Sequence, residues 1–433
     1  MKSDLPKVMH EIGGLALVGH VLKALVHAGS DRVSVVTGPG MPELEKLVGA
    51  LASDARCHVQ TERLGTAHAA LAARAALETH SDDVLVLFGD TPLVTAQTIG
   101  KVREALANGA DLAVLGFETA RPFGYGRLLT QGGRLVAIRE EKDASDEERK
   151  VTFCNSGIMG FSGKEALSLL EAIGNRNAKG EYYLTDAVEI ANQRGLKVVA
   201  VTGTEVETQG INTRAQLAAC EADFQARMRR AALENGTTLL AAHTVFFSHD
   251  TLLEADAIVE QNVVFGLGVR VAAGARIRAF SHLEGATVGE GAVVGPYARL
   301  RPGAVLGPDS RVGNFVEVKN ATFGAGAKAN HLSYIGDASV GSKSNIGAGT
   351  ITCNYDGYLK HRTEIGAGSF VGSNSTLVAP VKLGNGAFIA AGSVITDDVQ
   401  RDAMAFGRAR QVVKEGKAKK LRDKLQAAKD GKS

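Results

Sequence analysis

A six-residue period in the second half of the chain constrains its fold more than any other feature. A branched aliphatic residue returns at every sixth position in two separate runs, and Gly or Pro follows closely in the first run. A period of six is neither the 3.6 of a helix nor the 2 of an ordinary strand. It suits a prism of short parallel strands, in which each hexad points its aliphatic residue inward and stacked coils share one core. The sequence therefore predicts a parallel β-helix. The twelve residues are Val288, Val294, Leu300, Leu306, Val312, Val318, Ile365, Val371, Leu377, Leu383, Ile389 and Ile395.

The first half of the chain alternates between short apolar runs and segments with helical spacing. This alternation predicts a mostly parallel sheet covered by helices on both faces. Ligands of such sheets bind beyond the C-terminal ends of the strands. We expect helices at 18–28 and 66–78, and strands at 32–37, 84–88, 111–117 and 196–201.

Gly89-Asp90 follows one of these predicted strands directly. A carboxylate at such a strand end is a candidate ligand for Mg²⁺, which prefers oxygen donors and phosphates. An Asp that caps the turn before the next helix is an equally good explanation of this position.

Composition limits the class of protein. The formal net charge of +2 and the absence of Trp favour neither a nucleic-acid nor a membrane partner. The four cysteines lie far apart, as is typical of reduced thiols in a cytoplasmic protein. Neither a signal peptide nor an apolar run of about 18 residues is present. We therefore expect a soluble cytoplasmic protein.

Six ordered motifs in the first half carry a family resemblance. Together with the hexads they resemble the bifunctional N-acetylglucosamine-1-phosphate uridylyltransferases and glucosamine-1-phosphate N-acetyltransferases, over essentially the whole chain. The motifs are Ser3-Asp4-Leu5-Pro6-Lys7-Val8, Gln60-Thr61-Glu62-Arg63-Leu64-Gly65-Thr66, Gly89-Asp90, Gly124-Tyr125-Gly126-Arg127, Asn155-Ser156-Gly157 and Gly180-Glu181-Tyr182-Tyr183-Leu184-Thr185-Asp186.

The resemblance implies two consecutive steps towards UDP-N-acetylglucosamine, a precursor of bacterial peptidoglycan. Acetyl-CoA would acetylate glucosamine-1-phosphate, and UTP with Mg²⁺ would then convert N-acetylglucosamine-1-phosphate. It also implies a homotrimer. The expected organisation is a Rossmann-like α/β nucleotidyltransferase domain (1–213), a linker helix (214–235), and a left-handed parallel β-helix acetyltransferase domain with a basic tail (236–433).

The chain departs from the family pattern at its start. Family members carry a strand and a Gly-rich loop, L-A-A-G-x-G-T-R, before the segment that begins here with Met1. That loop would hold the nucleotide phosphates through backbone N–H groups. Without it we expect impaired uridylyl transfer, and an acetyltransferase with a relic first domain is the alternative.

The resemblance also assigns residues to the uridylyltransferase site. Lys7 would pair with a phosphate, and Asp90 with Asn212 would hold Mg²⁺. The ordinary structural explanations are a solvated Lys7, a Glu140 within a charged run and an Asn212 that caps a helix. The ordered set favours function over these. Uracil recognition falls to Gln60, Gly65 and Thr66, and the N-acetylglucosamine moiety to Gly126, Glu140 and Asn155.

The acetyltransferase site is expected where the hexad period breaks, between Val318 and Ile365. His331 would be the general base, because histidines exchange protons near neutral pH, and Glu317 would orient it. The resemblance supplies the remaining roles. Arg301, Lys319 and Lys360 would hold the sugar phosphate, and Tyr334, Asn345, Asn354 and Tyr355 would contact the sugar. Coenzyme A would lie along Ala348, Ser373, Ala391 and Arg408.

The segment from Arg408 onward holds ten Lys or Arg against three Asp or Glu. We expect it to be solvated and partly disordered beyond Lys417. Two other functions compete with the enzyme. A zinc hydratase on the same β-helix would need three converging histidines, and the second half shows none in ligand spacing. A pure scaffold would not need the clustered cations and histidine, and acetyl-CoA consumption would decide between them.

Overall fold

The computed structural model describes residues 1–177 and 179–431. The chain forms two compact units that divide between Met228 and Arg229, inside the long helix α9 (Arg214–Glu234). That helix coincides with the expected linker. Within the described ranges, no helix is long and apolar enough to cross a membrane.

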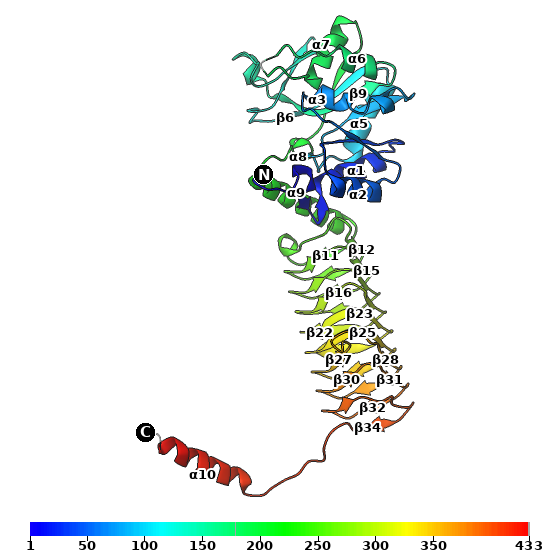
Figure 1. Cartoon of the computed structure of the whole chain (residues 1–433), viewed down its shortest axis with the longest axis vertical. Coiled ribbons are helices and arrows are strands. Elements are labelled where there is room, and N and C mark those ends of the chain that lie inside the picture. Colours follow the sequence, from blue (N-terminus) through cyan, green and yellow to red (C-terminus); the bar gives the residue numbers. More distant parts are fainter. Residues whose placement is uncertain (178, 432–433) are drawn as a thin grey trace. The chain divides into compact units, whose positions relative to one another are not determined.

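The first unit alternates helices and strands (Figure 1). Its other helices are α1 (Leu17–His27), α2 (Pro42–Leu51), α3 (Thr66–Leu71), α4 (Arg74–Leu77), α5 (Ala96–Ala107), α6 (Ala166–Ala172), α7 (Ala187–Gln193) and α8 (Glu205–Thr208). Its strands are β1 (Glu11–Ile12), β2 (Leu15–Ala16), β3 (Ser34–Thr37), β4 (Arg56–Val59), β5 (Asp83–Val86), β6 (Leu112–Glu118), β7 (Arg127–Gln131), β8 (Arg134–Arg139), β9 (Phe153–Ser162) and β10 (Val198–Thr202). Short 3₁₀ turns lie at Lys7–Met9, Glu148–Lys150 and Leu184–Asp186.

The main sheet is mixed, so the expectation of a mostly parallel sheet was wrong. β10 and β6 run parallel, but β9 runs antiparallel to both β5 and β6. The reason lies in the connection from β6 to β9, which contains the β7–β8 hairpin and no crossover helix. Without a crossover, the chain re-enters the sheet in the opposite direction.

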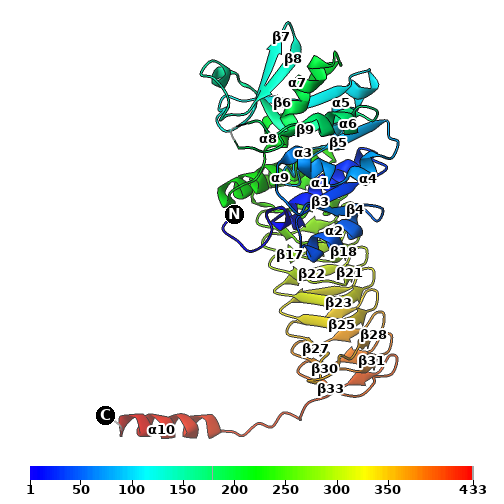
Figure 2. The same cartoon turned by 45° about the horizontal axis from the view of Figure 1, so that its top comes forward.

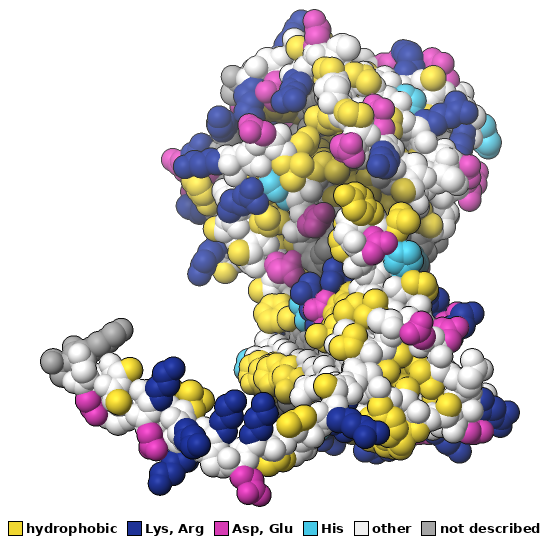
Figure 3. All heavy atoms as spheres, turned by 60° about the horizontal axis from the view of Figure 1, so that its bottom comes forward, with side chains coloured by type: hydrophobic (Ala, Val, Ile, Leu, Met, Phe, Trp, Pro, Cys, Tyr) yellow, Lys and Arg dark blue, Asp and Glu magenta, His cyan; other side chains and the backbone are white. Residues whose placement is uncertain are grey.

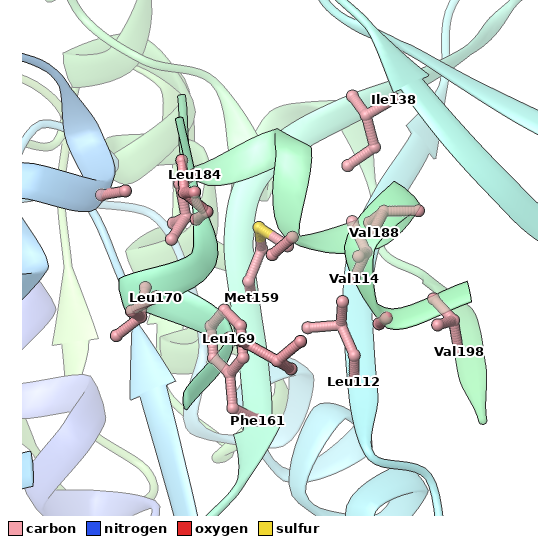
Figure 4. Close-up of a cluster of buried hydrophobic side chains, with 14 of the residues drawn as sticks. Leu112, Val114, Ile138, Met159, Phe161, Leu169, Leu170, Leu184, Val188 and Val198 are labelled. Carbon is pink, nitrogen blue, oxygen red and sulfur yellow. The ribbon is translucent and has the colours of Figure 1, made fainter. Parts of the chain in front are cut away.

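A dense core holds this sheet to its helices. Strand residues such as Leu112, Met159 and Phe161 pack against Leu169 of α6 and Val188 of α7 (Figure 4). All five are fully buried. Burying a side chain of this size stabilises the fold by about 1.5–3 kcal/mol, so this cluster fixes the sheet whose strand ends carry the candidate site.

Strands β3 and β4 form a separate parallel pair. In the described part of the chain, β3 is hydrogen-bonded only to β4, and β5 only to β9. Helix α1 packs beside both β3 and β5. Its Val18 and Leu22 share a core cluster with Val35 of β3, and its Leu25 shares another with Leu85 of β5. Each of β3 and β5 therefore has an unpaired edge.

The second unit is a β-helix with three strand faces (Figures 1 and 2). Face 1 contains β11 (Thr238–Leu239), β13 (Ile258–Val259), β16 (Arg276–Ile277), β19 (Val293–Val294), β22 (Arg311–Asn314), β24 (Lys328–His331), β26 (Asn345–Ile346), β29 (Phe370–Val371), β32 (Phe388–Ile389) and β34 (Met404–Ala405). Face 2 contains β12 (Leu252–Leu253), β15 (Arg270–Val271), β18 (Ala286–Val288), β21 (Ala304–Leu306), β28 (Thr363–Ile365) and β31 (Val381–Leu383). Face 3 contains β14 (Val264–Phe265), β17 (His282–Leu283), β20 (Arg299–Leu300), β27 (Ile351–Cys353), β30 (Thr376–Val378) and β33 (Val394–Ile395). The long strands β23 (Glu317–Phe323) and β25 (Tyr334–Val340) turn from face 3 to face 2. A short 3₁₀ turn lies at Ala242–Thr244.

The hexad prediction is confirmed residue by residue. All twelve predicted aliphatic residues are at most 5% exposed, and every strand pair of the three faces is parallel. Most coils take 17 or 18 residues, as from Leu283 to Leu300 and from Leu300 to Val318. The coil from Val318 to Ile335 takes 17, and the coil from Ile346 to Val371 takes 25. The predicted break in the period therefore contains a 17-residue coil followed by an inserted loop.

Two local expectations were wrong. The segment 66–78 is not one helix, because α3 ends at Leu71 and α4 begins at Arg74. The backbone N–H of Ala73 bonds to the carbonyl of Ala70, and this tight turn separates the two helices. The tail beyond Lys417 is solvated as expected, because every described residue there is exposed, but it forms the helix α10 (Lys417–Asp430) rather than a partly disordered segment.

Candidate functional site

The first candidate centre joins three predicted residues from distant parts of the first unit. The Lys7 ammonium donates to Asp90 Oδ2 at 2.5 Å and to Asn212 Oδ1 at 2.9 Å. Asp90 is held in place because its carbonyl accepts from the Ile211 backbone N–H at 3.0 Å. Asn212 does not cap α9, since the Thr213 hydroxyl accepts from the N–H of Gln216. The Thr213 hydroxyl thus caps α9, and the Asn212 amide oxygen accepts from Lys7 instead.

The same geometry tests whether Mg²⁺ fits. A carboxylate oxygen and an amide oxygen converge on one point, and a cationic group of the protein itself occupies that point. Hard oxygen donors of this kind suit Mg²⁺. Among the described residues, no group of three or more His, Cys, Asp or Glu is placed to hold a metal. A metal at Asp90 would therefore complete its shell with phosphate or water oxygens.

The predicted uracil-binding loop is tied to a distant segment. Gly65 has φ +123°, and a Cβ there would lie 2.5 Å from the Tyr182 carbonyl oxygen. The Thr66 hydroxyl accepts from the Leu184 backbone N–H, and the Gln60 amide contacts His68 Nδ1 at 3.0 Å. Only glycine fits this close approach, so the two segments define one wall of the site.

A cavity of about 540 Å³ lies beside this wall. It brings together the three residues predicted for the N-acetylglucosamine moiety, because Gly126, Glu140 and Asn155 all line it. A Cβ on Gly126 would lie 3.4 Å from Glu140 Oε1 and 3.6 Å from Asn155 Cβ. Burial raises the pKa of the Glu140 carboxyl, although the Lys179 charge opposes this.

Several lining residues carried no predicted role. The motif from Gly180 to Asp186 pointed to them, but sequence alone did not say which side chains face inward. Phe88 and Tyr125 also line the cavity, and Phe88 lies two positions before Asp90. Four more residues, from the region of the Gly180-to-Asp186 motif, also line the cavity: Lys179, Glu181, Tyr183 and Thr185.

The second candidate centre is a cluster of cations on the β-helix. Arg301 and Lys319 lie on successive coils, since the Arg301 N–H bonds to the carbonyl of Val318 at 2.8 Å. The direct contact with the Lys360 side chain, and after it the charges of Lys360 and Arg301, lower the pKa of the Lys319 ammonium. The Tyr334 hydroxyl lies one coil further along, beside Gly336, which is the strand neighbour of Lys319. A Cβ on Gly336 would come within 2.4 Å of that hydroxyl. Like charges held together in this way favour an anion.

Lys360 reaches the cluster from the inserted loop, which Asn354 anchors. The Asn354 amide donates to the buried carboxylate of Asp337, and Asn320 donates to the other oxygen at 2.6 Å. Burial would raise the pKa of Asp337, but these bonds and the charges of Lys360 and Lys319 lower it. Asp337 therefore stays ionised and fixes the loop. Tyr355 is 60% exposed and its hydroxyl donates to the carbonyl of Gly357 within the same loop.

His331 lies at the corner between faces 1 and 3, and its partner differs from the one expected. Its Nδ1 contacts Asn314 Oδ1 at 2.7 Å, and these two residues are direct neighbours on β24 and β22. Glu317 instead accepts from Arg301 at 2.7 Å. Glu317 therefore holds the Arg301 guanidinium in this structure, and Asn314, which sequence analysis missed, holds the histidine ring.

Asn345 lies apart from the other predicted sugar ligands. It belongs to face 1, where it lines a second cavity of about 480 Å³ with Arg311, Lys328 and Lys343. Tyr334 and the cation column lie on face 3 and at its edge. One copy of the chain thus divides the predicted set between two faces.

The residues predicted for coenzyme A stack at successive coil corners. The Asn374 N–H bonds to the carbonyl of Ala348, and the Gly392 N–H bonds to the carbonyl of Ser373. A Cβ on Gly372 would lie 2.5 Å from the Ala391 nitrogen, and one on Gly392 would lie 3.7 Å from Arg408 Cδ. Small residues keep this column accessible to a thin ligand, and Arg408 lies at its end.

An apolar column rises at the corner that carries His331. The rings of Phe280 and Tyr297 stack 4.9 Å apart, and those of Tyr297 and Phe315 stack 5.4 Å apart. Leu332 continues the column, because its N–H bonds to the Asn314 carbonyl one coil below. The four side chains are 47–61% exposed. A contiguous exposed apolar column of this kind marks an interaction surface.

Comparisons with known proteins agree with both halves. Residues 1–151 match the MobA-like NTP transferase domain, and residues 285–320 and 362–397 match the bacterial transferase hexapeptide family (six repeats). The chain is 60% identical over 422 residues to the bifunctional protein GlmU of Azorhizobium caulinodans, covering 98% of this chain and 94% of the relative. It is 58% identical to GlmU of Chelativorans sp. and 56% identical to GlmU of Agrobacterium fabrum, covering 100% of this chain and 96% and 95% of those relatives.

Proposed function

Because the chain belongs to the family of the bifunctional protein GlmU, it is a bifunctional enzyme of UDP-N-acetylglucosamine synthesis, and we propose how its residues divide the two reactions. The β-helix unit transfers an acetyl group from acetyl-CoA to glucosamine-1-phosphate. The first unit then transfers a uridylyl group from UTP to the product. The observation that supports this division is that each unit gathers its own predicted polar set, Lys7 with Asp90 and Asn212 in the first and Arg301 with Lys319 and Lys360 in the second.

In the acetyl transfer, the amino nitrogen of the sugar attacks the thioester carbonyl carbon. The C–N bond forms, the C–S bond breaks, and coenzyme A leaves as the thiolate. An amide oxygen can only accept a hydrogen bond, so the contact with Asn314 requires the proton on Nδ1 of His331. That leaves Nε2 free to take the proton of the attacking amine. Arg301, Lys319 and Lys360 hold the sugar phosphate, and the Ala348-to-Arg408 column holds coenzyme A.

In the uridylyl transfer, a phosphate oxygen of N-acetylglucosamine-1-phosphate attacks the α-phosphorus of UTP, and pyrophosphate leaves. Such transfers depend on positioning and charge neutralisation rather than covalent help from the protein. Asp90 and Asn212 would hold Mg²⁺, which neutralises phosphate charge when bound. Lys7 then moves from these oxygens to a phosphate. The cavity around Gly126, Glu140 and Asn155 holds the sugar, and Gln60 with Gly65 and Thr66 holds the uracil.

We further propose that the enzyme is a homotrimer with acetyltransferase sites completed between copies. Two observations support this. Asn345 lies on a different face from Tyr334 and the cations, so a neighbouring copy is needed to unite the set. The apolar column that ends at Leu332 borders His331 and is exposed in a single copy. Closed symmetric assembly would cover it.

The division of labour is tested with single substitutions in each centre. Lys319→Met should raise the KM for glucosamine-1-phosphate and leave pyrophosphate release unchanged. Asp90→Asn should lower pyrophosphate release at a given Mg²⁺ concentration and leave the KM for glucosamine-1-phosphate unchanged. A loss of both activities in either variant would contradict the assignment.

A further inference from the structure

A buried ion pair, Arg127 with Glu141, lies beside the cavity proposed for the sugar. Arg127 Nη2 donates to Glu141 Oε2 at 2.7 Å. Dark-blue Lys and Arg side chains project from the surface in Figure 3, whereas the Arg127 side chain is only 1% exposed. Across residues 1–177 and 179–431 it is the only Lys or Arg that is buried. Arginine is almost never fully buried unless it is paired, so this position marks a specific arrangement.

The arrangement is not an efficient source of stability. Taking two charges out of water costs about as much as their attraction returns, and apolar side chains of similar volume often stabilise a core as well. Arg127 Nε makes no hydrogen bond to any residue that the structure describes, which adds to the cost of burying it. The ion pair therefore suits a requirement for geometry rather than for stability.

The strand register puts this pair next to the three predicted sugar ligands. Arg127 is the register partner of Arg139 on β8 and of Cys154 on β9. Because both strand pairs are antiparallel, the residue before Arg127 meets the residue after each of these partners. The three residues that meet in this way are Gly126, Glu140 and Asn155.

Both partners of the ion pair hold the loop that precedes β7. Glu141 Oε2 accepts from the Gly124 backbone N–H at 3.2 Å, and Arg127 Nη1 donates to the Tyr125 carbonyl. Gly124, Tyr125 and Gly126 all line the cavity. The ion pair therefore fixes the backbone of this cavity wall relative to the end of β8, from which Glu141 extends.

Two adjacent carboxyl groups of the cavity differ in their protonation behaviour. Burial raises the pKa of Glu140. The hydrogen bond from Arg127 lowers the pKa of Glu141, although burial opposes this. Neighbouring carboxyl groups whose environments move their pKa values apart take different roles. Glu141 is thus ionised and held by the protein, and Glu140 is left to the sugar.

We propose that Arg127 and Glu141 are positioning residues for uridylyl transfer. They hold the loop backbone at the separation from Glu140 and Asn155 that the N-acetylglucosamine moiety requires. This inference rests on the proposed function, because it takes the cavity as the site of that moiety. The ion pair acts through the loop backbone, so its loss should affect the sugar phosphate and not UTP.

The experiment measures calorimetric binding of N-acetylglucosamine-1-phosphate to the full chain and the KM values for pyrophosphate release. Arg127→Met with Glu141→Leu removes both charges together and leaves no buried charge unpaired. The melting temperature of this double variant should stay near that of the unsubstituted chain. Its Kd and KM for the sugar phosphate should rise roughly tenfold or more, and its KM for UTP should not change.

Glu141→Gln is the milder variant, because it keeps an oxygen acceptor for the Gly124 N–H. It should raise the Kd for the sugar phosphate about threefold to tenfold, since the charged hydrogen bond from Arg127 is lost. The matched control is Glu147→Gln, which removes the same charge from an exposed pair with Lys150 at 2.6 Å and should not change this Kd. Acetyl-CoA consumption should be equal in all of these variants.

Glu140→Gln separates two ways in which the inference could fail. If it weakens binding of the sugar phosphate while Glu141→Gln and the double variant do not, the cavity binds the sugar but the ion pair has no positioning role. If none of the three weakens binding, the assignment of the cavity fails together with the inference. A loss of binding that only follows a fall in melting temperature, or an equal effect of Glu147→Gln, would also overturn the inference.

Discussion

Removing the hydrogen-bond acceptor of Asn314 tests the proposed orientation of the catalytic histidine. In Asn314→Ala, His331 loses its contact at 2.7 Å and can take either tautomer. During the reaction the imidazole gains a proton, so the lost bond is one to a charged group, worth about 1.5–3 kcal/mol. At about 1.4 kcal/mol per factor of ten, kcat for acetyl transfer should fall roughly 10- to 100-fold.

The KM for glucosamine-1-phosphate should change little in this variant, because Arg301 and Lys319 still hold the phosphate. Consumption of acetyl-CoA, followed by thiol release, gives both constants. Asn314→Asp keeps an acceptor at the same place and should retain most of the activity. Glu317→Gln is the matched comparison and should act mainly on KM, through its bond to Arg301. An unchanged kcat in Asn314→Ala, or an equal loss of kcat in Glu317→Gln, would refute the reasoning.

Three further predictions follow from other parts of the structure. Glu140→Gln should weaken binding of N-acetylglucosamine-1-phosphate roughly 10-fold or more but raise the melting temperature at pH 7. The sign of this stability change follows from the raised pKa, since the folded state disfavours the Glu140 carboxylate at pH 7. The gain in melting temperature should therefore vanish as the pH falls below the ordinary carboxyl pKa of 4.5. A variant that is less stable than the unsubstituted chain at pH 7 would contradict this. Phe315→Glu should dissociate the proposed trimer in sedimentation and lower acetyl transfer, whereas Tyr358→Glu, at a 93% exposed loop position, should do neither. Asn212→Ala should raise the Mg²⁺ concentration needed for half-maximal pyrophosphate release without affecting acetyl transfer, and an unchanged Mg²⁺ dependence would remove Asn212 from the metal site.

The sequence predicted the β-helix well because its hexads carry a period that no other fold requires. Residues such as Val294 and Leu377 needed no structure to be placed in the core. The family resemblance likewise indicated Lys7, Asp90 and Asn212 together, although 205 residues separate the first from the last. Where a residue type recurs at fixed spacing or in a specific motif, local pattern determines its place.

Contacts between coils were harder to predict. Asn314 meets His331 because the coil between them takes 17 residues, and a sequence does not show which coils take 17 and which take 18. Glu317 was expected beside His331, but its position on the coil places it beside Arg301. The direction of β9 also depended on the β7–β8 hairpin, which the alternating pattern did not reveal.

The most direct test of two separate active sites is a single measurement on His331→Ala. Coenzyme A release from acetyl-CoA and glucosamine-1-phosphate should fall by roughly two to four powers of ten, the usual contribution of a general base. In the same sample, pyrophosphate release from UTP and N-acetylglucosamine-1-phosphate should equal that of the unsubstituted chain measured beside it. Near-normal coenzyme A release would remove His331 from the mechanism, and a parallel fall of both rates would contradict the division of the two reactions between the two units.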